Sequence, residues 1–314
     1  MGKMRLIRDA YGTTEGFCLV KSASVRTDVK GSEYLDLVLA DCDGECVAKL
    51  WNYSRLTFGE YDANDIVKVR GTVQVWKDTE QFKIDRIRKA TPDDRVDMSA
   101  IIPCAPFDPQ QMYDELYETA AAFEDEELKR MVQYLLRENR EQLLLFPAGV
   151  KLHHATRGGL LHHTCSVLHL AQHIAELYPS LHKDLLYAGA ILHDIGKIRE
   201  LDANTLGIAG AYTGEGQLLG HINMGMAMIA AAAEITMVSP KTAMLLEHMI
   251  LSHHGKPEFG SPRLPMFPEA EVLSICDLLD SKMYEMDAAL DGVATDGFSE
   301  RLWALDNRQL YKID

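Results

Sequence analysis

The spacing of the apolar residues changes once along the chain, and this change constrains the fold more than any other feature. From Gly16 to about Ala90 apolar and polar residues alternate, which is typical of strands with one buried face. Residues 92–109 contain four prolines, which interrupt regular structure. After Pro109 the apolar residues recur with helical spacing. We therefore expect a multidomain chain, with an all-β domain over 1–91, an extended linker over 92–109 and an all-α domain over 110–314.

The first half has the length and turn signals of a small closed barrel. The alternating runs predict strands near 17–26, 34–39, 46–51, 67–76 and 81–88. Asp43-Gly44 is a hairpin signal between the second and third of these runs. About five strands in some 80 residues make the oligonucleotide-binding (OB) fold the leading candidate.

Strand phase also predicts a nucleic-acid-binding face on this barrel. One face carries interleaved aromatic and basic residues, namely Tyr34, Lys49, Trp51, Lys68, Arg70 and Trp76. Single-stranded nucleic acid is bound by such surfaces, because aromatic rings stack on bases and cations contact phosphates. The alternative is that Trp51 and Trp76 pack against the helical domain or a neighbouring subunit.

The charge is distributed unevenly. Residues 1–95 carry equal numbers of acidic and basic side chains, so the formal charge of −15 arises entirely after residue 95. This excludes a protein that coats nucleic acid or anionic membrane indiscriminately, but it allows a local basic groove. We find no apolar run of membrane-spanning length and no signal peptide, and the six cysteines form no C-x-x-C pair. We therefore expect a cytoplasmic protein with reduced thiols and no membrane contact. The sequence does not determine the number of subunits, and a homo-oligomer is compatible with it.

The second half is predicted to be a helical bundle. The expected helices lie at about 110–123, 125–145, 159–178, 182–195, 220–236, 239–253 and 268–290. All twelve histidines fall between His153 and His254. His193-Asp194 ends an apolar helix, and we expect Gly196 to let the chain turn away there.

Helical phase places several of these polar residues inside the bundle. His163 shares a stripe with Val167 and Leu170, and Asp277 lies on an apolar stripe of its own helix. A lone core histidine is ordinarily hydrogen-bonded to backbone, but several buried histidines and two buried aspartates need a common partner. A metal centre provides one. The candidate ligands are His163, His193, Asp194, His221, His253, His254 and Asp277.

Seven ligands exceed the needs of one ion, so we favour two divalent ions bridged by Asp194. One set would be His163, His193 and Asp277, and the other would be His221, His253 and His254. Imidazole and carboxylate donors without thiolate suit Mn²⁺, Fe²⁺, Zn²⁺, Ni²⁺ or Mg²⁺. Two such ions activate water for phosphoester hydrolysis. Asp194 and Lys197 are the catalytic candidates, although Lys197 is equally compatible with a solvated lysine at a helix C-terminus.

The arrangement of His163, His193-Asp194 and Asp277 resembles the HD-domain metal-dependent phosphohydrolases. Further stretches resemble the YhaM-type 3′-to-5′ exoribonucleases along nearly the whole chain: V-K-S-A-S (20–24), A-K-L-W (48–51), G-G-L-L-H-H-T (158–164), H-D-I-G-K (193–197), G-H-I (220–222), S-H-H-G-K-P-E-F-G-S-P (252–262), D-L-L-D-S-K (277–282) and R-L-W…R-Q-L-Y-K (301–312). The resemblance implies Mn²⁺-dependent hydrolysis of single-stranded RNA, and of DNA as a second substrate, to nucleoside monophosphates. The sequence departs from the family at His162, where a glutamate is expected.

Two other functions remain compatible with the sequence. One is an HD phosphohydrolase of small nucleotides or cyclic dinucleotides, in which the barrel serves assembly. The other is a non-catalytic nucleic-acid-binding factor with a structural metal.

Overall fold

The computed structural model describes residues 4–8, 12–76, 79–150 and 154–313, and it divides the chain into two compact units, Met1–Cys104 and Ala105–Asp314. The predicted linker over 92–109 contains this division. It holds two short 3-10 turns, η1 (Pro92–Asp94) and η2 (Met98–Ala100). The amide of Cys42 donates to the carbonyl of Ala100 at 3.2 Å, which ties η2 to the barrel. The segment is therefore partly folded, although the prolines predicted an extended chain. The predicted domain boundaries at residues 91 and 110 stay predictions.

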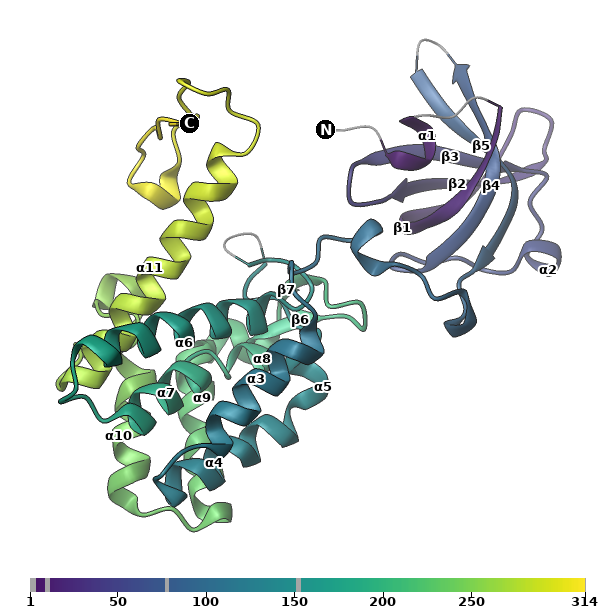
Figure 1. The fold of residues 1–314 in the computed structure, drawn as a ribbon. Coiled ribbons are helices and arrows are strands. Elements are labelled where there is room, and N and C mark those ends of the chain that lie inside the picture. The colour runs from purple at the N-terminus through teal and green to yellow at the C-terminus, as the bar shows by residue number, and fades with distance from the viewer. Residues whose placement is uncertain (1–3, 9–11, 77–78, 151–153, 314) are drawn as a thin grey trace. The chain divides into compact units, whose positions relative to one another are not determined.

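The first unit is a closed barrel of five strands, in agreement with the predicted OB fold (Figure 1). Its strands are β1 (Thr13–Thr27), β2 (Glu33–Ala40), β3 (Glu45–Trp51), β4 (Ile66–Trp76) and β5 (Thr79–Lys89), with short helices α1 (Arg5–Arg8) and α2 (Arg55–Phe58). The order β1-β2-β3-β5-β4 closes because β4 also pairs with β1. Only the β3–β5 pair is parallel among these pairings.

The apolar side chains at alternate positions of the strands fill the interior of the barrel, as the sequence predicted. Leu35, Leu37 and Leu39 of β2 are almost fully buried, and they meet Phe82 of β5 in one apolar cluster. The turn before β3 is held by Asp41, whose carboxylate accepts the amide protons of the two following turn residues, Asp43 and Gly44. Hydrophobic burial and local turn chemistry thus specify the same register.

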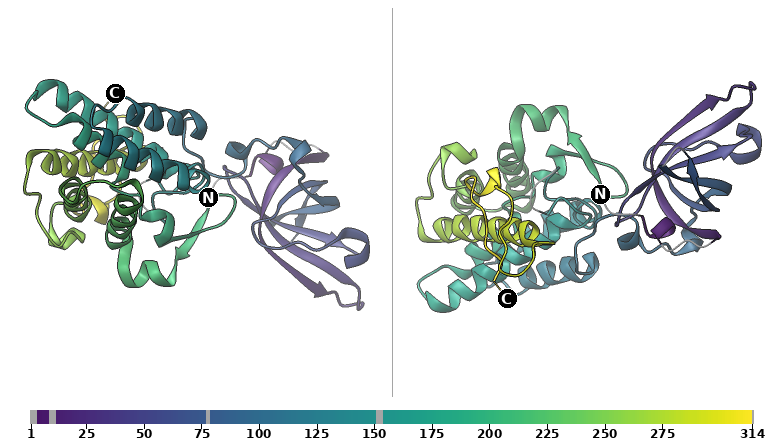
Figure 2. Two further views of the ribbon diagram at one scale, coloured as in Figure 1. Left: turned by 90° about the horizontal axis from the view of Figure 1, so that it is seen from below. Right: turned by 90° about the horizontal axis from the view of Figure 1, so that it is seen from above.

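The second unit is a helical bundle with helices close to the predicted positions (Figure 2). They are α3 (Pro109–Ala121), α4 (Glu126–Glu138), α5 (Arg140–Leu143), α6 (Gly159–Leu177), α7 (Lys183–Leu192), α8 (Lys197–Glu200), α9 (Gly214–Thr236), α10 (Pro240–Ser252) and α11 (Pro268–Leu290), with turns η3 (Pro257–Phe259) and η4 (Trp303–Leu305). The Ser239 hydroxyl caps α10 by accepting the amide proton of Thr242. The core is one apolar cluster to which α3, α4, α6, α7, α9, α10 and α11 contribute.

The structure differs from the predicted helices between α8 and α9. A short antiparallel hairpin, β6 (Leu201–Ala203) and β7 (Ala209–Tyr212), lies there and was not predicted, because three- and four-residue strands carry too little alternation to detect. Helix α9 starts earlier than expected and has a kink at Gly220, where φ is 70° and ψ is 158°. This non-helical residue directly precedes His221, so the kink sets where that ring points.

Helix α9 is also the single helix of the described segments that is long and apolar enough to cross a membrane by length and composition. The sequence analysis expected no such segment. This test is weak for one helix, because core helices of other proteins pass it as well. Here α9 packs against α4, α8 and α10 and carries His221 of the candidate site.

Gly196 lies in the turn between α7 and α8, where the chain was expected to turn away. Its φ of −64° and ψ of −20° are open to any residue, so packing and not backbone freedom requires a glycine there. A Cβ at this position would lie 2.0 Å from the carbonyl oxygen of His221 and 2.7 Å from the amide nitrogen of Gly225. The absence of a side chain therefore allows α9 to approach the start of α8.

We expect Gly196→Ala to lower the melting temperature, because the added methyl group forces α8 and α9 apart. Overpacking of this kind typically costs about 1–3 kcal/mol in the free energy of unfolding. Gly214→Ala is the matched control, since no atom lies within 4 Å of a Cβ built there. Equal melting temperatures for the two variants, measured by calorimetry, would contradict this account of Gly196.

Candidate active site

Five helices bring the predicted ligands to one place in the second unit. His163 comes from α6, His221 from α9 and Asp277 from α11. His193 and His253 are the C-cap residues of α7 and α10. The structure thus gathers residues that are more than a hundred positions apart in the sequence, and the candidate residues Asp194 and His254 follow the two caps directly.

The first group of donors, His163, His193 and Asp277, is buried, and Asp277 reaches the cavity wall. His163 Nε2 lies 3.1 Å from His193 Nε2 and 3.1 Å from Asp277 Oδ1. Burial lowers the pKa of His163, but its hydrogen bonds with Asp277 and Asp280 outweigh burial and raise the pKa to about 9. Burial raises the pKa of Asp277, but the hydrogen bond from His163 holds it well below its usual range. This group therefore favours positive charge at its centre.

The second group consists of His221, His253 and His254, whose donor atoms all lie within 4.8 Å of one another. Burial holds the pKa of His253 and of His254 below the usual value for histidine. Both rings are therefore neutral at pH 7 and keep a lone pair, which is the form of imidazole that binds metal.

Asp194 lies between the two groups. Its Oδ2 is 3.4 Å from His193 Nε2 and 3.5 Å from His163 Nε2. Its Oδ1 is 3.6 Å from His221 Nε2 and 3.8 Å from His253 Nε2. One carboxylate thus faces both groups, with a different oxygen toward each, which is the arrangement required of a bridging ligand.

Each of the five histidines directs Nε2 inward because Nδ1 is occupied by an oxygen acceptor. His193 and His253 donate to the carbonyls of Ala190 and Ile250, three residues earlier in their helices, at 2.8 and 2.6 Å. The remaining three contacts join His163 to Asp280 at 2.7 Å, His221 to Glu200 at 3.1 Å and His254 to the carbonyl of Phe259 at 2.6 Å. An oxygen acceptor fixes a proton on Nδ1, so Nε2 is the atom that can offer a lone pair to a metal, in His163 once its second proton has left.

Three of these inward atoms have no hydrogen-bond partner among the described residues. They are Asp194 Oδ1, His221 Nε2 and His253 Nε2, all buried. Buried polar atoms are ordinarily paired, and here acceptor faces acceptor, so no hydrogen bond among them can form. A cation satisfies all three at once. The donors present therefore fit a divalent metal, as the histidine and aspartate pattern predicted.

Lys197 is buried and points into the site. Its Nζ lies 2.6 Å from Asp194 Oδ2. Burial lowers the pKa of this ammonium, but the charge of Asp194 outweighs burial and raises the pKa, so Lys197 is protonated. The alternative of a solvated lysine at a helix C-terminus is wrong, because Lys197 is 7 % exposed and begins α8.

Three residues of the site were missed by the sequence analysis. Glu200 accepts the Nδ1 proton and the amide proton of His221. Asp280 accepts hydrogen bonds from His163 at 2.7 Å and from His154 Nε2 at 2.9 Å. The ring of His154 lies 4.0 Å from that of Tyr284, between centroids. Asp280 follows Asp277 by three residues, so helical spacing offered a signal for it, whereas Glu200 and His154 carried none.

His162, where the resemblance implies a glutamate, lies beside the site. Its Nδ1 is 3.1 Å from His154 Nδ1, and its ring packs edge-on against Phe107. Burial and the neighbouring His154 lower the pKa of His162 to about 4, so the ring is neutral at pH 7. This position therefore lacks the negative charge of a glutamate.

The other histidines do not belong to the cluster. His169 and His173 are on the exposed face of α6, His182 caps α7, and His248 accepts the amide proton of Met266. His153 lies outside the described residues.

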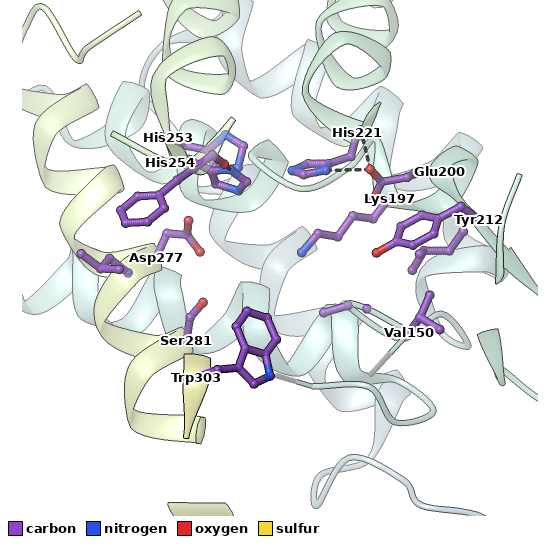
Figure 3. Close-up of a pocket in the computed structure, with 15 residues that line it drawn as sticks. Val150, Lys197, Glu200, Tyr212, His221, His253, His254, Asp277, Ser281 and Trp303 are labelled. Carbon is purple, nitrogen blue, oxygen red and sulfur yellow. Dashed lines mark hydrogen bonds and ion pairs between the residues drawn. The ribbon is translucent and has the colours of Figure 1, made fainter. Parts of the chain in front are cut away.

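A cavity of about 700 Å³ opens over the two groups of donors (Figure 3). Figure 3 shows the ammonium of Lys197 pointing into this space between His221 and Asp277. The lining also includes Glu200, His253, His254, Ser281 and three aromatic residues. Binding sites for small ligands typically measure about 300–1,000 Å³, so a nucleotide unit fits here.

On the barrel, the predicted nucleic-acid-binding residues fall into two places. Tyr34 and Trp51 are cross-strand partners with ring centroids 4.7 Å apart, and Lys49 Nζ lies 5.3 Å from the Tyr34 ring. Trp51 and Lys49 also line a cavity of about 300 Å³ with Lys83, which was not predicted.

The other predicted barrel residues lie on β4. Lys68 is paired with Glu15 of β1 at 2.6 Å, which neutralises part of its charge. Arg70 is exposed and is the strand partner of Glu15. Trp76 is the last residue of β4, and its side chain lies outside the described ones.

Comparison with known proteins finds a matching domain family, similar protein sequences and similar solved structures. The HD domain family matches residues 160–282. The 3′-5′ exoribonuclease YhaM of Bacillus licheniformis is 38 % identical over 312 residues, which cover 99 % of this chain and 98 % of the relative. The protein of the same name from Geobacillus sp. (strain WCH70) is 40 % identical over 296 residues, covering 94 % and 90 %. A chain of the replication protein A heterotrimer bound to ssDNA covers 27 % of this chain and 62 % of its own, at 17 % identity and a TM-score of 0.23.

We predict that metal affinity rises with pH below about pH 9. The pKa of His163 is raised to about 9, so at neutral pH a proton occupies the ring and must leave when a metal binds. Each proton displaced makes the apparent affinity rise about tenfold per pH unit. Titration calorimetry with Mn²⁺ from pH 6.5 to 8.5 measures this slope.

The variant Asp280→Asn provides the comparison. It removes a carboxylate that raises the pKa of His163, so the slope should become shallower in the same pH range. A pH-independent affinity in the unmodified protein, or an unchanged slope in the variant, would contradict the prediction.

Proposed function

This chain belongs to the family of YhaM 3′-5′ exoribonucleases, and from that premise we propose that it removes nucleoside monophosphates from the 3′ end of single-stranded RNA with two divalent ions held on either side of Asp194. The observation that carries the proposal is the position of Asp194. Each of its oxygens faces a separate group of imidazole donors, and Oδ1 has no hydrogen-bond partner among the described residues. Metal-dependent hydrolysis is the activity that this family and its HD domain support.

The donor sets divide as follows in this proposal. His163, His193 and Asp277 would hold one ion, His221, His253 and His254 would hold the other, and Asp194 would contribute to both. When bound, such ions activate water and neutralise charge on phosphate oxygens. The resemblance to the family implies Mn²⁺, whereas imidazole and carboxylate donors without thiolate suit Fe²⁺, Ni²⁺, Zn²⁺ and Mg²⁺ as well.

The chain's own residues supply orientation and charge. Glu200 and Asp280 fix the rings of His221 and His163 through Nδ1, so both Nε2 atoms stay directed into the site. Lys197 contributes a fixed positive charge at the cavity, because its raised pKa keeps the ammonium protonated. A phosphodiester carries one negative charge, so an ammonium on the cavity wall favours its binding and orients it.

The barrel is proposed to hold the single strand through Tyr34, Lys49 and Trp51. These three side chains form one cluster in which rings and a cation lie within 6 Å of one another. Lys83 extends the positive charge along the adjoining cavity. Because stacking and phosphate contact do not depend on base identity, this surface suits an enzyme that degrades many sequences.

The variant Asp194→Asn should abolish degradation of a 5′-labelled single-stranded RNA. The amide keeps the shape of the side chain but removes its charge and one acceptor, so we expect a rate loss of at least about a hundredfold. Gel electrophoresis of the shortening ladder with Mn²⁺ measures the rate, and elemental analysis of both proteins measures metal content.

His173→Asn is the matched control, because His173 is 79 % exposed in its side chain and lies on the outer face of α6. Full activity of Asp194→Asn would contradict the catalytic assignment. Cleavage of free nucleotides or cyclic dinucleotides without any RNA ladder would favour a small-nucleotide phosphohydrolase instead.

The variant Trp51→Ala should weaken RNA binding. Loss of one base–aromatic stack typically costs about 1–3 kcal/mol, so the Kd should rise about five- to a hundredfold. Fluorescence anisotropy with labelled single-stranded RNA measures Kd, in the Asp194→Asn background so that the RNA stays intact. Leu56→Ala, at a fully exposed position of α2, is the control. Equal Kd values for the two variants would exclude Trp51 from the binding surface.

A further inference from the structure

Three aromatic side chains surround the cavity and have no part in the function proposed above. Tyr212, Phe259 and Trp303 line it and are 46 %, 56 % and 73 % exposed. In Figure 3, Trp303 and Tyr212 stand beside the open space into which Lys197 points. Three large, exposed rings at one opening place apolar surface around the site, and exposed apolar surface marks binding sites. Their chemistry indicates a ligand that offers a flat aromatic face.

Two of these rings are tied to the residues that orient the donors. Tyr212 ends β7 and pairs with Leu201 of β6, directly after Glu200. The backbone carbonyl of Phe259 accepts the Nδ1 proton of His254 at 2.6 Å. The backbones of both residues are therefore held close to the second group of donors, which favours a role in placing a substrate over that group.

The third ring comes from the C-terminal segment, whose R-L-W motif has no role in the function proposed above. Trp303 begins η4, which packs against α11, the helix of Asp277. Leu305 is buried, and Leu302 pairs with Arg308 in a β-bridge that closes the turn. An anchored turn thus presents a mostly exposed indole at the cavity.

We propose that Trp303, together with Tyr212 and Phe259, forms a stacking platform for the unpaired bases at the 3′ end of the substrate. Every nucleobase has an aromatic face, so stacking on such rings tolerates any sequence. A base inside a duplex is stacked on its neighbours and paired, and reaches a platform only after it is unstacked. The platform therefore selects single-stranded ends. This inference rests on the proposed nuclease function, because the platform serves the same site.

The platform has a kinetic signature. The base takes no part in breaking the phosphodiester bond, so its stacking would hold the substrate equally before and during the reaction. Loss of such uniform binding raises KM and leaves kcat unchanged. A purely structural role of Trp303 would instead lower kcat or metal content, because α11 also carries Asp277.

The experiment compares a normal RNA with one whose 3′-terminal nucleotide lacks its base. For the unmodified protein, the abasic end should raise KM about tenfold for removal of the first nucleotide, with kcat within about twofold. Trp303→Leu should raise KM about tenfold on the normal RNA, and the abasic end should then add little, because the interaction is already lost. Trp303→Phe should restore most of the affinity.

Phe298→Leu is the matched control for this segment. Phe298 is 65 % exposed, lies in the same C-terminal stretch and packs on Tyr311, and it does not line the cavity. An abasic end that the unmodified protein handles as well as a normal one would overturn the proposal. So would a Trp303→Leu variant that loses kcat or metal while KM stays constant.

A binding measurement separates this inference from the nuclease function. Adenosine 5′-monophosphate should bind the Mn²⁺-loaded protein about tenfold more tightly than ribose 5-phosphate, and Trp303→Leu should abolish the difference. Titration calorimetry needs no turnover. Failure to degrade RNA would therefore overturn the nuclease function alone, whereas equal binding of the two phosphates would overturn the platform alone.

Discussion

The buried carboxylate of Asp194 is the constraint on which the rest of the helical unit depends. A charged group that is 2 % exposed is costly unless its surroundings compensate for it. Here Lys197 provides most of that compensation, followed by His193 and His221, and they hold the pKa of Asp194 well below its usual value despite burial. These partners come from α8, from the C-cap of α7 and from α9, so the three helices are brought together at this residue. Packing of these helices and assembly of the site are therefore coupled.

The ends of two helices show how this coupling works in detail. The last carbonyls of a helix have no partner within it, and a side chain that donates to one of them ends the helix well. His193 and His253 do this with Nδ1, each to the carbonyl three residues earlier. The same contact fixes the proton on Nδ1 and directs Nε2 into the site. One hydrogen bond thus terminates the helix and orients a donor.

The sequence predicted what depends on local periodicity. Alternation predicted the barrel, helical phase predicted that His163 and Asp277 point inward, and the H-D pair located the end of α7. It did not predict contacts between distant segments. Asp280 contacts His163 across 117 positions, and its spacing from Asp277 on the same helix does not predict that contact. Gly196 is a clearer example. The need for a glycine there depends on the nearby backbone of α9, and local sequence does not determine where that backbone lies.

The net charge of −15 is a poor guide to what this chain binds, because binding depends on where the charges lie. The acidic excess follows residue 95, in the unit whose cavity holds Lys197 and the donor groups. A polyanion approaching that unit is repelled over most of its surface and attracted at the cavity, where bound cations reverse the sign. Diffuse attraction along the strand is then absent, so the end of the strand must be held by contacts of another kind. Aromatic rings, which carry no net charge and bind bases at any ionic strength, meet that requirement.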